Sequence, residues 1–165
     1  MKKIIYLMLA SVALFASCAK DPIGNTATVD MAGEWYVTVD VVDENGEILY
    51  EDPYGMGPVI FSTFNTAANK ADEMFVSDNY NFLEFQVQVK ADPAAMTFET
   101  EGIAQNLVSE CGVTISSGKI TLGGAKTPSG MSADAIEFLI SFDDDDNEFI
   151  YKVHGFRYTG LAGDE

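Results

Sequence analysis

Alternation of apolar and polar residues with a period of two is the feature that most constrains this chain of 165 residues. Odd positions are apolar in Trp35–Val41 and in Leu83–Val89, and even positions are apolar in Ile136–Phe142. Successive side chains of a β-strand point to opposite faces, so this pattern predicts strands with one buried face. Asn45-Gly46 adds a strong hairpin signal. The alternation predicts an all-β, antiparallel domain.

The remaining strands are expected between these three segments and near the end of the chain. They are predicted at Pro58–Phe64, Met74–Ser77, Met96–Thr100, Val113–Ile115, Ile120–Leu122 and Phe149–Tyr158. About eight to ten consecutive strands joined by hairpins favour an up-and-down barrel, because closing the sheet removes its edges. A two-sheet β-sandwich is the alternative.

The N-terminus carries a signal for export. Lys2 and Lys3 precede an apolar run of twelve residues from Ile4 to Phe15. At ~1.5 Å per residue, a helix of this length is too short for the ~30 Å hydrocarbon core of a bilayer. We therefore expect a cleaved signal helix over residues 1–17. The segment from Phe15 to Cys18 resembles the lipobox of bacterial lipoproteins, which implies a diacylated Cys18 as the lipid anchor.

The segment after Cys18 indicates how the chain is organised and where it resides. Residues 18–28 are predicted to be the lipidated cysteine and a flexible tether, followed by a single domain over residues 29–165. Ala19-Lys20-Asp21 resembles a partial surface-export signal of Bacteroidota lipoproteins. We expect an outer-membrane lipoprotein of the cell envelope, bound to the lipid bilayer through Cys18, with surface exposure as a further expectation.

The charge of the chain limits its partners. The net charge is −17, and removal of Lys2 and Lys3 with the signal leaves seven basic and 26 acidic residues, or −19. Such a surface repels nucleic acid and anionic headgroups, so no nucleic-acid partner is expected. With Cys18 acylated, Cys111 has no partner for a disulfide and is predicted to be a small buried apolar residue.

Two resemblances bear on the fold. Gly33-Glu34-Trp35 opens the first long strand, and the single arginine, Arg157, lies in the last one. This arrangement resembles that of lipocalins, in which a basic side chain of the last strand packs over the signature tryptophan and closes one end of the barrel. The resemblance implies a lipocalin-like barrel with Trp35 and Arg157 as the closing pair, their groups within about 6 Å.

The second resemblance covers nearly the whole chain after residue 18. The segments that carry it are Asn65–Asn69, Asp72–Met74, Val113–Ile115, Gly118–Ile120, Thr127–Gly130, Ala133–Phe138 and Tyr151–Gly160. They resemble a family of Bacteroidota lipoproteins known as lipid-binding putative hydrolases. The resemblance implies a lipocalin-like barrel that binds lipid, and it supplies no catalytic residues.

Side chains that point into such a barrel are the candidate ligand-binding residues. They are Val37, Val39, Phe61, Phe85, Val87, Phe138, Ile140, Phe142 and Tyr151. None of them is charged, so the ligand is expected to be apolar. A barrel of about eight strands either fills with side chains or holds one small ligand, and both alternatives remain open here.

No motif for catalysis, cofactor or metal binding is present in the sequence. His154 is the single histidine and lies in a predicted strand, and no G-x-S-x-G elbow exists to expose a serine. Asp143 to Asp146 are consecutive and lack the alternation and the glycine of a calcium loop, which favours a solvated turn. We therefore predict no catalytic residue, cofactor or metal ligand.

Three functions remain open. The first is an envelope lipoprotein that binds a lipid or another apolar ligand without catalysis. The second is a surface accessory or glycan-handling lipoprotein that acts through loops, where Tyr50, Tyr54, Tyr80 and Phe82 either stack on sugars or pack at the rim. The third is a hydrolase, which rests on the family resemblance alone. The ligand, any protein partner and the oligomeric state are not specified by the sequence.

Overall fold

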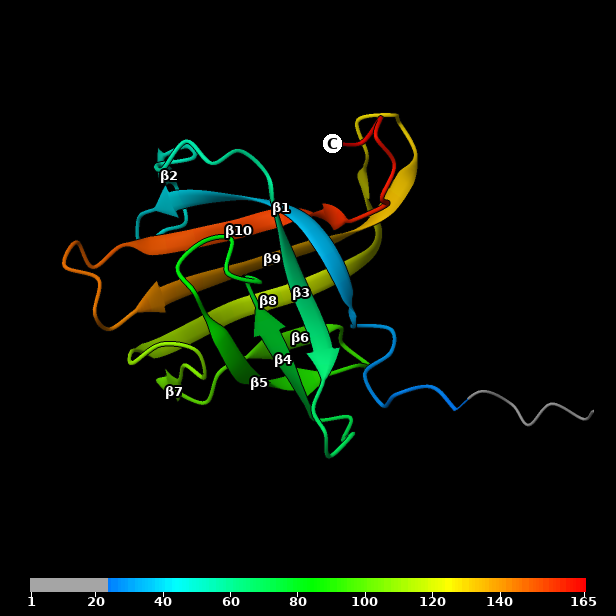
Figure 1. Cartoon of the computed structure of the whole chain (residues 1–165), viewed down its shortest axis with the longest axis horizontal. Coiled ribbons are helices and arrows are strands. Elements are labelled where there is room, and N and C mark those ends of the chain that lie inside the picture. The colour runs from blue at the N-terminus through cyan, green and yellow to red at the C-terminus, as the bar shows by residue number, and fades with distance from the viewer. Residues whose placement is uncertain (1–23) are drawn as a thin grey trace, which may run out of the picture.

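The computed structural model describes residues 24–165, so the expected signal helix and Cys18 lie outside the described residues. Ten strands account for all of the regular structure in this part of the chain (Figure 1). They are β1 (Gly33–Val42), β2 (Ile48–Tyr50), β3 (Val59–Asn65), β4 (Glu73–Ser77), β5 (Gln86–Asp92), β6 (Thr97–Glu99), β7 (Ala104–Gln105), β8 (Gly112–Lys126), β9 (Ser132–Phe142) and β10 (Ile150–Arg157). Among residues 24–165, no helix is long and apolar enough to cross a membrane.

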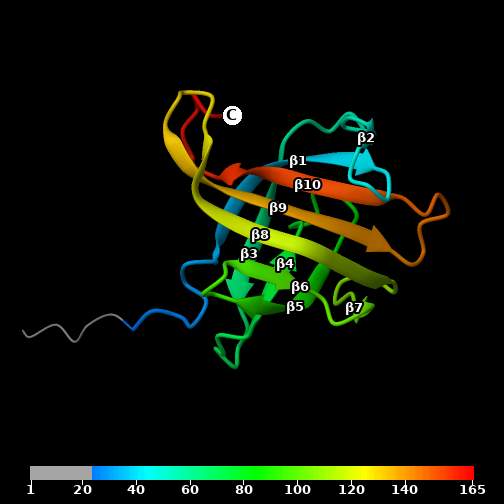
Figure 2. The same ribbon diagram turned by 180° about the vertical axis from the view of Figure 1, so that it is seen from behind.

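Eight of the strands form a closed antiparallel barrel. β1, β3, β4, β5, β6, β8, β9 and β10 follow one another in chain order, and β10 pairs back with β1. The closing pair runs from Trp35 opposite Arg157 to Val42 opposite Ile150. β2 pairs with the end of β1, and β7 pairs with β8, outside the ring (Figures 1 and 2). The predicted all-β up-and-down barrel is confirmed, and the two-sheet alternative is wrong because the sheet closes.

The alternation in the sequence becomes the inside and outside of the barrel wall. In β1, Trp35, Val37 and Val39 are buried, whereas Tyr36 and Thr38 between them are half-buried. The last strand was ambiguous in sequence because aromatics occur on both of its faces. In the structure Tyr151 and Val153 are its buried members.

The glycine of the last strand is required by close packing. A Cβ atom on Gly155 would lie 2.1 Å from the carbonyl oxygen of Tyr36 in the neighbouring strand. A backbone this close leaves no room for a side chain, which explains a glycine inside a strand that closes the barrel.

The two ends of the barrel differ. At the end called here the closed end, the N-terminal segment turns at Thr28–Met31 and buries Met31 completely. The first described residues and the C-terminus both lie at this end (Figures 1 and 2). At the opposite end, called here the mouth, lie β2, β7 and the loops 78–85 and 143–149. These loops position the candidate site.

Candidate functional site

The middle of the barrel is filled by aromatic side chains. The rings of Phe61 and Phe85 lie 5.6 Å apart, and those of Phe98 and Phe138 also lie 5.6 Å apart. Phe61 and Phe138 connect the two pairs at 6.4 Å. All four side chains are at most 3% exposed. Ring separations of about 4.5–7 Å are those of directly packed aromatic pairs, so side chains occupy this part of the interior.

All nine of the predicted ligand-binding residues belong to the buried hydrophobic core, although they do not lie together at one site. Phe142 and Tyr151 line a depression at the mouth. The other seven are buried in the core and do not line this depression. Phe142 is 7% exposed and Tyr151 is fully buried, so the nine predicted residues offer little accessible surface as the core is packed.

The depression at the mouth has a volume of about 540 Å³ and an aromatic lining. Tyr54 comes from the loop between β2 and β3, Phe82 from the loop between β4 and β5, Phe142 from the end of β9 and Tyr151 from the start of β10. The rings of Phe82 and Tyr151 are 5.1 Å apart, and those of Tyr54 and Phe82 are 5.9 Å apart. Small-molecule sites typically measure about 300–1,000 Å³, so this depression has the size of a ligand site.

The rim of the depression is acidic. Glu84, Asp144, Asp145 and Asp146 line it together with Asn147. The Tyr151 hydroxyl donates a hydrogen bond of 2.8 Å to Asp145. Because that hydroxyl has one proton, the 2.8 Å contact between the hydroxyls of Tyr54 and Tyr151 has Tyr54 as its donor.

These hydrogen bonds set the protonation states at the rim. Burial raises the pKa of Tyr151, and its contacts with Tyr54 and Asp145 raise it further. Burial acts to raise the pKa of Asp145 as well, but hydrogen bonds from the Asn147 backbone and from Tyr151 outweigh it and lower the pKa. A negative carboxylate therefore adjoins a neutral phenol at the rim.

The loop that carries Phe82 is organised around a buried carboxylate. Asp78 is 1% exposed and accepts hydrogen bonds from the backbone N–H groups of Tyr80, Phe82, Glu84 and Phe85. Asn79, Tyr80 and Glu84 have positive φ values of 53°, 63° and 53°. Such backbone conformations persist only where surrounding contacts hold them, and Asp78 provides those contacts. Asp78 thus fixes the position of Phe82 in the mouth.

Cys111 lies at the edge of the same depression. It is half-buried rather than fully buried as predicted, and its Sγ is 3.2 Å from the Ser109 hydroxyl and 3.3 Å from the Asn106 amide nitrogen. The thiol is therefore part of the lining of the depression. The acidic rim residues and Cys111 were not predicted as site residues, because they come together only when the loops converge.

His154 is not part of this depression. Its Nε2 lies 2.9 Å from a carboxylate oxygen of Asp40, which is 4% exposed and also accepts the backbone N–H of Asp52. Within residues 24–165, no side-chain hydrogen bond joins His154 to a serine, threonine or cysteine. In the same part of the chain, no group of three acidic, histidine or cysteine residues is arranged to hold a metal ion.

At the closed end, Arg157 lies over Trp35 with 4.5 Å between the guanidinium carbon and the ring centroid. This is the contact expected from the sequence. The guanidinium also donates to Asp134 at 3.0 Å and to the carbonyl oxygen of Ala32 at 2.8 Å. The Trp35 indole donates to the Thr63 hydroxyl at 2.8 Å. These contacts seal the end of the barrel opposite the mouth.

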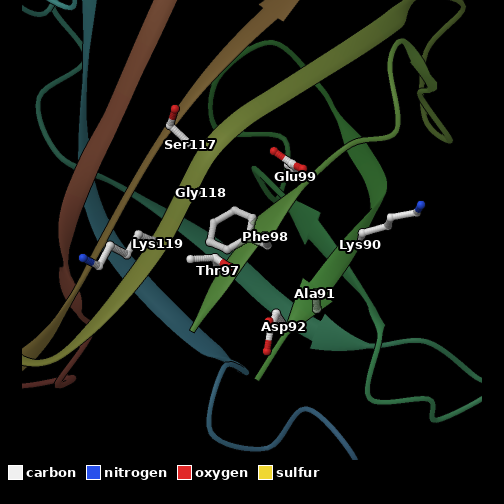
Figure 3. A pocket seen from close by; sticks show the side chains of 9 residues that line it. All are labelled: Lys90, Ala91, Asp92, Thr97, Phe98, Glu99, Ser117, Gly118 and Lys119. Carbon is white, nitrogen blue, oxygen red and sulfur yellow. The ribbon is translucent and has the colours of Figure 1, made fainter. Parts of the chain in front are cut away.

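A second depression, of about 420 Å³, lies where β5, β6 and β8 meet (Figure 3). Its one aromatic ring, Phe98, is 3% exposed and packs beside Gly118. Lys90 and Lys119 extend away from each other in this view, and Lys90 is paired with Glu101 at 2.8 Å. The aromatic surface accessible to a ligand is therefore larger at the mouth than here.

Comparisons with known proteins agree with the second resemblance noted in the sequence. The family model described as lipid-binding putative hydrolase matches residues 20–162. A crystal structure of a protein of unknown function from Bacteroides ovatus is 13% identical, with a TM-score of 0.47, over 80% of this chain and 43% of that one. The chain thus corresponds to less than half the length of that protein. No curated protein sequence matches the chain.

Proposed function

The chain belongs to the family of lipid-binding putative hydrolases, and from this premise we propose that it binds an apolar small ligand at the mouth of its barrel. The observation that carries the proposal is the aromatic depression of about 540 Å³ formed by Tyr54, Phe82, Phe142 and Tyr151. The packed interior directs the ligand to this end, because the deeper rings already contact one another.

The aromatic rings are the main source of affinity in this proposal. Tyr54 is 50% exposed, so a ligand that covers it removes apolar surface from water. Phe82 and Leu83 extend the same surface along the loop from β4 to β5. Burial of such surface stabilises a complex by roughly 25 cal/mol per Å². A short acyl chain or a ring would bury surface of this kind.

Titration with octyl glucoside, a neutral amphiphile, tests this function. Binding is measured by calorimetry below the micellar concentration, and methyl glucoside serves as the matched compound without a chain. Tyr54→Ser should weaken octyl glucoside binding roughly fivefold to tenfold, since it removes one ring from the lining. Tyr50→Ser is the matched control, because Tyr50 is 57% exposed but packs against Phe149 and does not line this depression.

A second readout uses the thiol at the edge of the site. Bound octyl glucoside should slow the reaction of Cys111 with a thiol reagent in a Cys18→Ser background. No binding of octyl glucoside together with unchanged Cys111 reactivity would refute an apolar site at the mouth. Equal affinity for methyl glucoside would favour the glycan-handling alternative, which the exposure of Tyr50, Tyr54 and Tyr80 by 50–69% supports.

Hydrolysis is not the function that the site supports best. The family description includes it, yet His154 lies against Asp40 on another part of the barrel wall. The mouth holds the hydroxyl of Ser109 and the thiol of Cys111 without a histidine in its lining. A nucleophile of this kind needs an adjacent base, and binding needs none.

We also propose that the protein is an envelope lipoprotein anchored through Cys18. The support is the short apolar run before Cys18, together with the exit of the N-terminal segment at the closed end, opposite the mouth (Figure 1). Cys18→Ser should move the protein from the membrane fraction to the soluble fraction in a bacterium with lipoprotein machinery. Unchanged retention by the membrane would refute the anchor.

A further inference from the structure

The charge around the mouth specifies the ligand further. We propose that the ligand of this site is a cationic amphiphile, an apolar chain or ring that bears an amine or ammonium group. This inference rests on the proposed function and concerns the same depression. It is carried by the combination of an aromatic floor with a rim whose charged side chains are all acidic.

The rim carboxylates are available to a ligand. Glu84, Asp144 and Asp146 make no side-chain hydrogen bond and no ion pair with residues 24–165, and Asp144 and Asp146 are exposed. No lysine, arginine or histidine lines the depression. Their negative charge is therefore not neutralised by a neighbouring side chain of this part of the chain.

The aromatic floor adjoins this negative charge directly. Tyr151 is buried, but its hydroxyl donates to Asp145 and lies 2.8 Å from the hydroxyl of Tyr54, whose side chain is 50% exposed. A carboxylate thus lies near an accessible aromatic ring at one point of the rim. A cation is attracted to the face of an aromatic ring when it lies within about 6 Å of the centroid. An ammonium group at this point would contact the exposed ring of Tyr54 near the Asp145 carboxylate, while its alkyl chain would cover Phe82 and Leu83.

Other ligand charges fit less well. An anionic head at the rim would face four carboxylates at short range, and like charges in a partly enclosed site repel. An inorganic cation would bind to the carboxylates but would leave the aromatic rings exposed to water. The apolar floor therefore selects organic cations, and the rim selects against anions.

The test compares four compounds by calorimetry at roughly 20 mM and 150 mM salt. Octyltrimethylammonium, octyl glucoside and octyl sulfate share the same chain and differ in the charge of the head group. Tetramethylammonium keeps the cationic head and lacks the chain. We expect octyltrimethylammonium to bind roughly tenfold more tightly than octyl glucoside at low salt, and octyl sulfate to bind more weakly than either. Tetramethylammonium should bind far more weakly than its octyl derivative.

Matched variants separate the rim from the overall negative charge of the protein. Asp144→Asn with Asp146→Asn should abolish most of the preference for the cation, measured as the ratio of octyltrimethylammonium affinity to octyl glucoside affinity in the same variant. Asp30→Asn with Glu34→Gln removes the same charge from exposed positions at the closed end and should preserve the preference.

The two proposals fail separately in this design. Binding of octyl glucoside with no preference for octyltrimethylammonium would overturn the cationic ligand and leave the apolar site standing. An equal loss of the preference for the cation in the two double variants would also overturn the cationic ligand, because the preference would then come from the net charge of the protein. Equal binding of tetramethylammonium would exclude an amphiphile. Absence of binding by all four compounds would overturn both proposals.

Discussion

Arg157 lies over the face of Trp35, 4.5 Å from its centroid, and is held there by two further contacts. Asp134 accepts from Nε at 3.0 Å, and the carbonyl oxygen of Ala32 accepts from Nη1 at 2.8 Å. The guanidinium thus joins the end of β10 to the start of β1 and to β9. It closes the barrel at the end where the two terminal strands meet.

Replacement of Arg157 by Gln should destabilise the fold by roughly 1–3 kcal/mol, since it removes a cation–π contact and a charge-assisted hydrogen bond. Urea unfolding followed by the fluorescence of Trp35, the single tryptophan, measures the loss. Lys152→Gln is the control, because Lys152 pairs with Glu137 at 3.1 Å on the surface and should cost under about 0.5 kcal/mol. Equal losses in the two variants would contradict a special role of Arg157.

Gly33 makes room for the same guanidinium. A Cβ atom at position 33 would lie 2.1 Å from Nη1 of Arg157. We expect Gly33→Ala to displace the guanidinium and to shift the Trp35 emission, at a cost of roughly 1–2 kcal/mol. In the Arg157→Gln background the same change should cost about 1 kcal/mol less, and a double-mutant cycle measures this coupling. Additive effects would show that Gly33 serves another purpose.

The contact at the closed end was implied by the resemblance to lipocalins, and the register of the strands explains why it forms. Trp35 and Arg157 each sit at a fixed place in a strand, and antiparallel closure of β1 on β10 puts them opposite one another. The period-two pattern likewise determines which side chains enter the barrel, and all nine predicted inward residues are in the core. Local pattern is enough wherever the strands themselves position the residues.

The mouth was not predictable in the same way. Whether Phe61, Phe85 and Phe138 enclose a cavity or pack together depends on side-chain volumes in three dimensions, and the rings pack. The lining comes from four loops and two strand ends, whose approach is set by contacts such as Asp145 with Tyr151. Asp143–Asp146 was predicted as a solvated turn. Asp144 and Asp146 are exposed, whereas Asp145 is half-buried against Tyr151.

Acid should release the C-terminal tail from the β8–β9 hairpin. Hydrogen bonds from Ser129 and Thr159 lower the pKa of Asp164 from 3.8 to about 2. Because the folded pKa is depressed, the stabilisation is fully present above about pH 4 and is lost as the pH falls through about 2. The difference in stability between wild type and Asp164→Asn should therefore be larger at about pH 5 than at about pH 2. A difference independent of pH would contradict the role of this carboxylate.

The last prediction concerns Asp78, the buried carboxylate beneath the mouth. Four backbone N–H groups donate to it. Without the carboxylate these groups can bond only to water, and the loop already contains three non-glycine residues at positive φ. Asp78→Ala should therefore cost roughly 2–4 kcal/mol and increase hydrogen exchange over residues 79–85. Phe82 would lose its fixed position, so octyl glucoside affinity should fall as well.

Asp92→Ala provides the comparison for this experiment. Asp92 also accepts two backbone N–H groups in a turn, from Ala94 and Ala95, but it is exposed and is the last residue of β5. Its loss should cost about 1 kcal/mol or less, because water can replace it, and should leave exchange in the 79–85 loop and binding at the mouth unchanged. If Asp78→Ala left exchange and binding as they are in the wild type, the loop would be held by the packing of Phe82 and Phe85 instead of by the carboxylate.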